Sequence, residues 1–198
     1  MIRIGGWSAL STCDWPGRLV TTVFCQGCPW RCGYCHNPEL LPARAPAAVG
    51  WDEVARHLAH RTGLLDGVVF SGGEPLLQRG LPEAVREARA LGLEVGLHTG
   101  GAFPRRFARL LDAGLLDWVG FDVKAPPGRY ERVTGIGHAA ASAERSLRLL
   151  LASGVPHQLR TTVDPALLDG TALTDLDAWL ASLGAAPPVR QPARAATP

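Results

Sequence analysis

The chain concentrates its cysteines in one short stretch. Of its five cysteines, Cys25, Cys28, Cys32 and Cys35 lie close together, and Cys13 stands apart. An odd number of cysteines argues against a framework of disulfides and favours metal or redox chemistry. We expect Cys13 and Cys25 to be small buried apolar side chains rather than ligands.

Two kinds of metal site are compatible with the cluster. Cys25/Cys28 and Cys32/Cys35 are both CxxC pairs, which together could hold a structural zinc ion. Zinc sites usually separate two such pairs by about a dozen residues or more, and here the gap is much shorter. Alternatively, Cys28, Cys32 and Cys35 have the spacing CxxxCxxC and could bind three irons of a 4Fe-4S cluster. The fourth iron would then be open to a small molecule.

A glycine-rich segment further along the chain is a second candidate. Gly72 and Gly73 let the backbone approach a ligand closely, because no Cβ stands in the way. The carboxylate of Glu74 beside them suits an ammonium group, such as the one on an amino acid. The alternative is an ordinary Gly-Gly turn followed by a solvated glutamate.

Three charged residues form a third candidate. Asp122 and Lys124 are two positions apart on an expected strand, so both face the same side. A buried Asp and Lys are costly unless they pair with each other or bind a ligand. A structural ion pair is therefore the alternative to a binding role, and Arg160 has the same two interpretations. Lys124 is the only lysine in the sequence, which favours a role for a compact ammonium.

Two further positions have polar side chains near these motifs. Asn37, which together with His36 follows the last cysteine of the cluster, is a candidate for contacts with a nucleoside or a partner. Because Asn37 precedes Pro38, a plain turn is the alternative. His98 could be a ligand, but we expect a histidine at a strand end whose hydrogen bonds are satisfied within the fold.

Strand and helix patterns alternate along the chain, which predicts a single α/β domain with mostly parallel strands. We expect strands over 20–24, 67–70, 94–98, 118–123 and 157–163, and helices over 51–61, 81–91, 104–112, 142–153 and 173–183. This domain would span 1–184. The segment 185–198 is predicted to be a flexible tail, although a further strand near 189–191 is an alternative. In parallel α/β folds ligands bind at the carboxyl ends of the strands, where all three candidate groups fall.

Composition narrows the class of protein. With 198 residues, 46% hydrophobic residues and a net charge of +2, the chain has the length and balance of one globular domain. The charge balance gives no signature of nucleic-acid binding, and no apolar run is long enough to span a membrane. The first residues lack the apolar core of a signal peptide, so we expect a cytoplasmic protein.

With these motifs in order, the chain resembles the radical S-adenosylmethionine (SAM) superfamily. More narrowly, it is similar to the activating proteins of anaerobic ribonucleoside-triphosphate reductase, a glycyl radical enzyme. The resemblance rests on Cys28 to Cys35 with an aromatic Tyr34 before the last cysteine, on Ser71 to Pro75, on Leu97 to Gly100, and on Asp122 to Lys124. It covers most of the chain.

The resemblance implies a partial (β/α)6 barrel and a 4Fe-4S cluster held by Cys28, Cys32 and Cys35. It implies that Gly72, Gly73 and Glu74 bind the methionyl amino group of SAM. The other residues expected to line the cofactor site are Tyr34, Asn37, Asp122, Lys124 and Arg160. Related activases carry an Asp of a monovalent-cation site where this chain has His98, so the sequence departs from the pattern there.

The resemblance also implies a reaction and partners. The enzyme would reductively cleave SAM to a 5′-deoxyadenosyl radical, which takes a hydrogen atom from a glycine of the anaerobic reductase. An electron donor such as a flavodoxin would reduce the cluster. The alternatives are an activase of another glycyl radical enzyme, of the formate-lyase type, and a non-catalytic iron–sulfur electron carrier.

Overall fold

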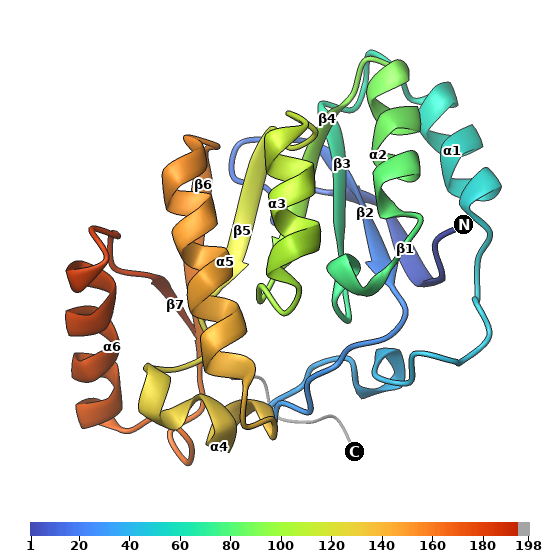
Figure 1. The fold of residues 1–198 in the computed structure, drawn as a ribbon. Helices are drawn as coiled ribbons and strands as arrows, with labels where there is room; N and C mark the ends of the chain where they lie inside the picture. The colour runs from blue at the N-terminus through green and yellow to red at the C-terminus, as the bar shows by residue number, and fades with distance from the viewer. Residues whose placement is uncertain (194–198) are drawn as a thin grey trace.

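The computed structural model describes residues 1–193 and shows one α/β domain (Figure 1). Its seven-stranded sheet has the strands in sequence order, from β1 to β7. The strands are β1 (Ile4–Ser11), β2 (Val20–Cys25), β3 (Gly67–Gly72), β4 (Glu94–Thr99), β5 (Trp118–Asp122), β6 (His157–Val163) and β7 (Val189–Pro192). Strand β1 is antiparallel to β2, and every later pair is parallel. The expected fold class is confirmed.

Helices connect the parallel strands; they lie along one side of the sheet, except that the short α4 lies at the carboxyl end of the strands (Figure 1). They are α1 (Trp51–His60), α2 (Leu81–Ala90), α3 (Pro104–Asp112), α4 (Tyr130–Thr134), α5 (Ala139–Ser153) and α6 (Gly170–Ser182). Short 3-10 turns add η1 (Pro38–Leu40), η2 (Pro75–Leu77) and η3 (Pro127–Arg129). Sequential strand order with right-handed crossovers places all helices outside. Within the described residues β1 and β7 do not pair, so the barrel is partial.

The helix layer covers one face of every central strand. Alternate strand residues point outward, among them Phe70, Leu97 and Phe121, and all three are almost completely buried. They pack in one cluster with Leu58 of α1 and Phe107 of α3. Because strand side chains alternate between faces, the intervening residues face the concave interior.

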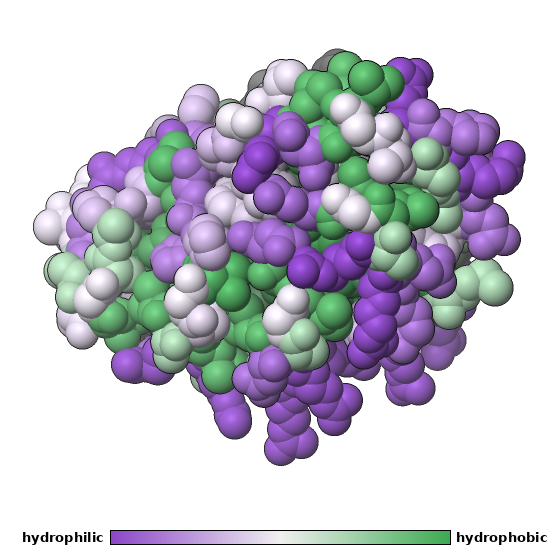
Figure 2. Space-filling view, turned by 90° about the horizontal axis from the view of Figure 1, so that it is seen from above, coloured by the Kyte–Doolittle hydropathy of each residue, from purple (hydrophilic) through white to green (hydrophobic). Residues whose placement is uncertain are grey.

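Aromatic side chains fill the interior at the amino-terminal end of the strands. Trp15, from the connection between β1 and β2, stacks on Trp118 with ring centroids 5.4 Å apart. The pair packs with Val20 and Val69 in a separate buried cluster. Gly96 makes room for it, because a Cβ there would lie 2.9 Å from Trp15. Figure 2 shows this end of the molecule, where hydrophilic residues lie among hydrophobic ones.

The last part of the chain departs from the expected tail. Val189–Pro192 form β7, which pairs in parallel with β6. Its residues are exposed, so its place is set by backbone pairing rather than by an apolar face. The further strand near 189–191, given above as the alternative to a tail, is the one observed. The remainder of the expected tail, 194–198, lies outside the described residues. Among the described residues, no helix is long and apolar enough to cross a membrane.

Candidate active site

The cysteine loop leaves the carboxyl end of β2 and is held by α4. The backbone N–H of Arg31 donates to the Thr134 carbonyl at 2.8 Å, and that of Gly33 donates to the Val133 carbonyl at 3.3 Å. The Arg31 guanidinium also donates to the Cys28 carbonyl at 2.8 Å. Cys28, Cys32 and Cys35 are each partly exposed on this loop. The loop is therefore ordered by backbone contacts, and its thiols stay accessible.

Trp30 anchors the same loop to the sheet. Its side chain is 4% exposed and packs with its ring edge toward Tyr130 of α4, at a centroid distance of 6.2 Å. The ring lies against Gly100, just after β4, where any Cβ would overlap it. Trp30 is thus a packing residue that fixes the position of the cysteine loop.

The glycine-rich segment is joined to the start of the cysteine loop. The Gly73 N–H donates to the Cys25 carbonyl, and the Glu74 N–H donates to the Gly27 carbonyl, both at 2.9 Å. Gly72 has a φ of 106°, and a Cβ there would overlap the backbone of Cys25. Close backbone contact requires glycine at this position. The two loops therefore form one unit at the carboxyl edge.

Glu74 is a buried, hydrogen-bonded side chain rather than a solvated one. It is 2% exposed. Its carboxylate accepts hydrogen bonds from Thr99 Oγ1 at 2.7 Å, from the Leu76 N–H at 3.1 Å and from the Gly100 N–H at 3.1 Å. Burial raises the pKa of Glu74, and these hydrogen bonds oppose that shift. Glu74 thereby joins the ends of β3 and β4.

Thr99, within the Leu97 to Gly100 segment that carries the resemblance, holds the Glu74 carboxylate. Its hydroxyl donates to Glu74 and accepts from the Gly101 N–H at 2.9 Å. At 2% exposure it is buried with its partner. The sequence placed Thr99 at a strand end but did not indicate that Glu74 is its partner.

Asp122, Lys124 and Arg160 are brought together as an ion triad. Lys124 Nζ lies 3.2 Å from Asp122 Oδ2, and Arg160 Nε lies 2.9 Å from Asp122 Oδ1. The Arg160 and Lys124 side chains are only 15% and 16% exposed. Burial disfavours the charges, but Arg160 and Lys124 outweigh it and hold the pKa of Asp122 well below its usual range. Burial likewise opposes the charge on Lys124, yet Asp122 raises the pKa of Lys124 above its ordinary value.

His98 is satisfied within the fold, as the sequence analysis expected. Its Nε2 lies 2.7 Å from the Asp14 carbonyl and 3.1 Å from Nη1 of Arg160, and its Nδ1 lies 3.1 Å from Ser71 Oγ. The carbonyl can only accept and the guanidinium can only donate, so these two contacts ask opposite roles of Nε2. Burial lowers the pKa of His98 to about 4, and the nearby Arg160 guanidinium adds to the shift. Asp14 is held in turn by the Thr22 hydroxyl at 2.7 Å.

Tyr34 lies between the triad and the cysteines. Lys124 Nζ is 5.9 Å from its ring centroid. Its hydroxyl is buried and, within residues 1–193, has no hydrogen-bond partner. Burial raises the pKa of Tyr34. A buried hydroxyl without a partner is costly, so this atom fits a site that is completed by a polar ligand.

The remaining residues, Cys25, Cys13 and Asn37, differ in their exposure. Cys25 is completely buried in the core under the helices, as expected, and faces away from the other thiols. Cys13 is exposed in the connection between β1 and β2, so the expectation that it is buried is wrong. Asn37 is partly buried at the turn before η1, where its side chain makes no cap and its carbonyl accepts from Leu40 at 3.0 Å.

The three loop cysteines lie on one ordered loop and are each partly exposed. Among residues 1–193, no group of three or more His, Cys, Asp or Glu side chains is placed to hold a metal ion. A cubane would assign each thiolate to a different iron. Burial, with Glu74 next, raises the pKa of Cys28 to about 12, and burial also raises the pKa of Cys32. Burial thus favours the neutral thiols at these two positions, and a bound cationic group would favour the thiolates.

Comparison with known proteins agrees with this geometry. Residues 22–180 match the Radical SAM superfamily. A Methanocaldococcus jannaschii protein, provisionally named a glycyl-radical enzyme activating enzyme, is 26% identical over 178 residues, covering 87% of this chain and 73% of that protein. The pyruvate formate-lyase-activating enzyme of Clostridium pasteurianum is 38% identical over 103 residues, which are 50% of this chain and 42% of that enzyme.

Solved structures show the same fold at low sequence identity. SuiB of Streptococcus suis has a TM-score of 0.66 at 11% identity, covering 87% of this chain and 39% of that one. The structure of anSMEcpe with bound AdoMet has a TM-score of 0.65 at 18% identity, covering 85% and 49%. The chain thus spans less than half of these two structures. The superfamily match covers most of the chain, from β2 to α6, and so the protein belongs to the radical SAM superfamily, whose members use a 4Fe-4S cluster and SAM.

Proposed function

We propose that this radical SAM enzyme is an activase that generates a glycyl radical on a partner enzyme, and that the partner is an anaerobic ribonucleoside-triphosphate reductase. The observation that carries the first part is the similarity over 178 residues to a protein named as a glycyl-radical enzyme activating enzyme. The choice of the reductase rests on the sequence motifs alone. An electron donor such as a flavodoxin and a cytoplasmic setting belong to the same proposal.

The cysteine loop would hold the cluster through Cys28, Cys32 and Cys35. A bound, reduced cluster would supply the electron for the cleavage of SAM to methionine and a 5′-deoxyadenosyl radical. The chain itself supplies position and shelter. Trp30 and the contacts with α4 keep the loop against the sheet, so the three thiols keep one arrangement during the reaction.

The glycine-rich loop would bind the methionyl amino group through the backbone of Gly72 and Gly73. Glu74 fixes this backbone, because its carboxylate is anchored to Thr99 and to the N–H of Gly100. Its negative charge also lies close enough to Cys28 to raise that thiol's pKa, and a negative charge at this place favours an ammonium.

The triad would bind the anionic and polar parts of SAM. Two cations share the single carboxylate of Asp122, so the group is net positive and suits the methionyl carboxylate. Lys124 Nζ lies 5.9 Å from the ring centroid of Tyr34. The Tyr34 hydroxyl, which has no partner within residues 1–193, would form a hydrogen bond with the bound molecule. Asn37, at the end of the cysteine loop, would contact the nucleoside.

A formate-lyase type of target is the second candidate. It is favoured by the 38% identity to the Clostridium pasteurianum enzyme, which covers a shorter segment. An iron–sulfur electron carrier would not need the triad or the glycine-rich loop.

The experiment is anaerobic activation of candidate partners. The cluster-loaded, reduced protein is mixed with SAM and either the reductase or the formate-lyase, and the glycyl radical is measured by electron paramagnetic resonance. We expect a radical signal with the reductase that is absent when its acceptor glycine is replaced by alanine. A signal only with the formate-lyase would assign the second target, and SAM cleavage without radical on either would contradict the activase proposal.

A further inference from the structure

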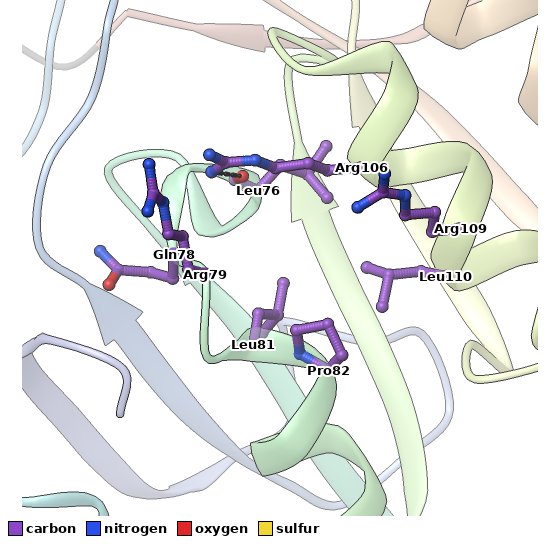
Figure 3. A pocket seen from close by; sticks show the side chains of 8 residues that line it. All are labelled: Leu76, Gln78, Arg79, Leu81, Pro82, Arg106, Arg109 and Leu110. Carbon is purple, nitrogen blue, oxygen red and sulfur yellow. Dashed lines mark hydrogen bonds between the residues drawn. The ribbon is translucent and has the colours of Figure 1, made fainter.

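A cavity lies outside the proposed SAM site, between the start of α2 and helix α3 (Figure 3). Its volume is about 300 Å³, which is at the lower end of the range for ligand sites. The residues that line it are Leu76, Gln78, Arg79, Leu81, Pro82, Arg106, Arg109 and Leu110. It begins two residues after Glu74 and adjoins the carboxyl edge of the sheet, but none of the candidate SAM-binding residues takes part in it.

The rim of this cavity is cationic. Arg79, Arg106 and Arg109 line it, and none of the described residues that line it is acidic. Arg79 and Arg109 are exposed, and neither is in an ion pair within residues 1–193. The amino terminus of α2, which has no side-chain cap, adds the positive end of its dipole beside Pro82.

Arg106 is held in place before any ligand arrives. Its Nη1 donates to the Leu76 carbonyl at 2.9 Å and to the Leu77 carbonyl at 2.5 Å, and its guanidinium lies over the Phe103 ring at 5.0 Å. Figure 3 shows the first of these hydrogen bonds. A fixed guanidinium loses little side-chain entropy on binding a carboxylate.

The floor of the cavity is apolar. Leu76, Leu81 and Leu110 are 1%, 1% and 2% exposed, and Pro82 lies beside them (Figure 3). An inorganic anion would satisfy the guanidinium groups but would not fill the space over these leucines. A ligand that fills the cavity must therefore combine an apolar group with negative charges on either side.

We propose that this cavity is a docking site for an acidic segment of a protein partner, in which carboxylates flank an aliphatic side chain. The aliphatic side chain would lie on Leu81 and Leu110, and the carboxylates would pair with the three arginines. Arginine next to a buried apolar centre is the composition that concentrates binding energy at protein interfaces. This site goes beyond the proposed function, since it requires neither SAM nor the glycyl radical.

A fluorescently labelled peptide of sequence Glu-Glu-Leu-Glu-Glu is the probe, titrated against the cluster-loaded protein without oxygen. We expect the double variant Arg79→Glu/Arg109→Glu to bind it at least about tenfold more weakly, which corresponds to about 1.4 kcal/mol. Arg105→Glu is the matched control, because Arg105 is exposed on the same helix but does not line the cavity. Its affinity should stay within about twofold of the unmodified protein, as for a surface charge that touches no ligand.

Three results would overturn the proposal. The first is that the peptide does not bind to the unmodified protein. The second is that Arg105→Glu weakens peptide binding as much as the double variant does. The third is that pyrophosphate displaces the peptide, and that replacing the peptide leucine by serine does not lower the affinity. The last would assign the cavity to a small phosphate-bearing molecule instead. Cleavage of SAM without a partner is measured on the same variants and should be unchanged, so failure of the docking proposal is distinguishable from failure of the proposed function.

Discussion

Arg160 Nε lies 2.9 Å from Oδ1 of Asp122, and the two residues are directly paired across β6 and β5. The second oxygen of the same carboxylate is taken by Lys124 at 3.2 Å. Strand register therefore sets the position of Arg160 relative to Asp122, and Lys124 follows two residues after β5 ends. A binding site for an anionic group requires side chains that are held in place in this way.

Replacing Asp122 by Asn should remove the countercharge from two largely buried cations. We expect a fall in the free energy of unfolding of about 1–3 kcal/mol and a higher KM for SAM. The Asp122 pKa lies well below its usual range. The contribution of the ionised Asp122 to the free energy of unfolding is therefore present above about pH 4, the ordinary pKa of Asp, and is lost as the pH falls further. Urea unfolding and the rate of SAM cleavage measure the two effects.

The control is Asp177→Asn, which removes a partner of Arg190 in a pair that is about 40% exposed. Exposed pairs contribute about 0–1 kcal/mol. An Asp122 variant that is no less stable than this control would contradict the buried triad.

His98 should make stability depend on pH. Its pKa is about 4 in the fold and about 6.5 in the unfolded chain, so between these values the unfolded chain binds more protons. The contribution of His98 to the free energy of unfolding is fully present above about pH 6.5. It falls by at most about 1.4 kcal/mol per pH unit as the pH drops toward 4. The polar groups facing His98 are Asp14, Ser71, Asp122 and Arg160.

The His98→Gln variant keeps a donor toward the Asp14 carbonyl and has no titrating group. We expect the difference in unfolding free energy between pH 7 and pH 5 to be smaller in this variant than in the unmodified, cluster-loaded protein. Equal differences in both proteins would show that another group causes the pH dependence.

Thr99→Val should leave one hydrogen bond of the buried Glu74 carboxylate unmade. Removing a partner from a buried polar group costs about 1–3 kcal/mol, and loosening of the glycine-rich loop should raise the KM for SAM. Thr99→Ser keeps the hydroxyl and should restore the KM. If the serine variant were as impaired as the valine variant, packing of the methyl group rather than the hydroxyl would be responsible.

Gly100→Ala should displace the cysteine loop, because the added Cβ overlaps the Trp30 ring. We expect reduced iron content after reconstitution and an unfolding free energy lower by about 1–3 kcal/mol, as for overpacking in a core. Gly170→Ala is the control, since a Cβ there meets nothing within 4 Å at the start of α6. A full complement of iron in Gly100→Ala would contradict the role assigned to Trp30.

The sequence was sufficient for the main elements and the principal chemistry. Apolar periodicity located α3 and β6 with their observed bounds, and strand alternation put Asp122 and Lys124 on one side. The sequence analysis did not find β1, because Gly5 and Gly6 weaken its strand pattern. Its antiparallel partner is β2, and no short hairpin turn between the two strands marks the pair.

The contacts that complete the site are long-range and had no local signal. Asp14 meets His98 across 84 positions of sequence, and Glu74 meets Thr99 across 25. Cys13 was expected to be buried because small apolar cysteines usually are, yet the connection that carries it directs Trp15 inward and leaves Cys13 exposed.

The most direct test of the central claim is reductive cleavage of SAM by the protein itself. The cluster is reconstituted without oxygen and reduced, and 5′-deoxyadenosine is measured for the unmodified protein and for alanine variants of Cys28, Cys32, Cys35 and the exposed Cys13. The account predicts product from the unmodified protein and from Cys13→Ala, and none from the other three variants. Undiminished product from Cys32→Ala, or no product from fully loaded protein even with its partner enzyme, would contradict it.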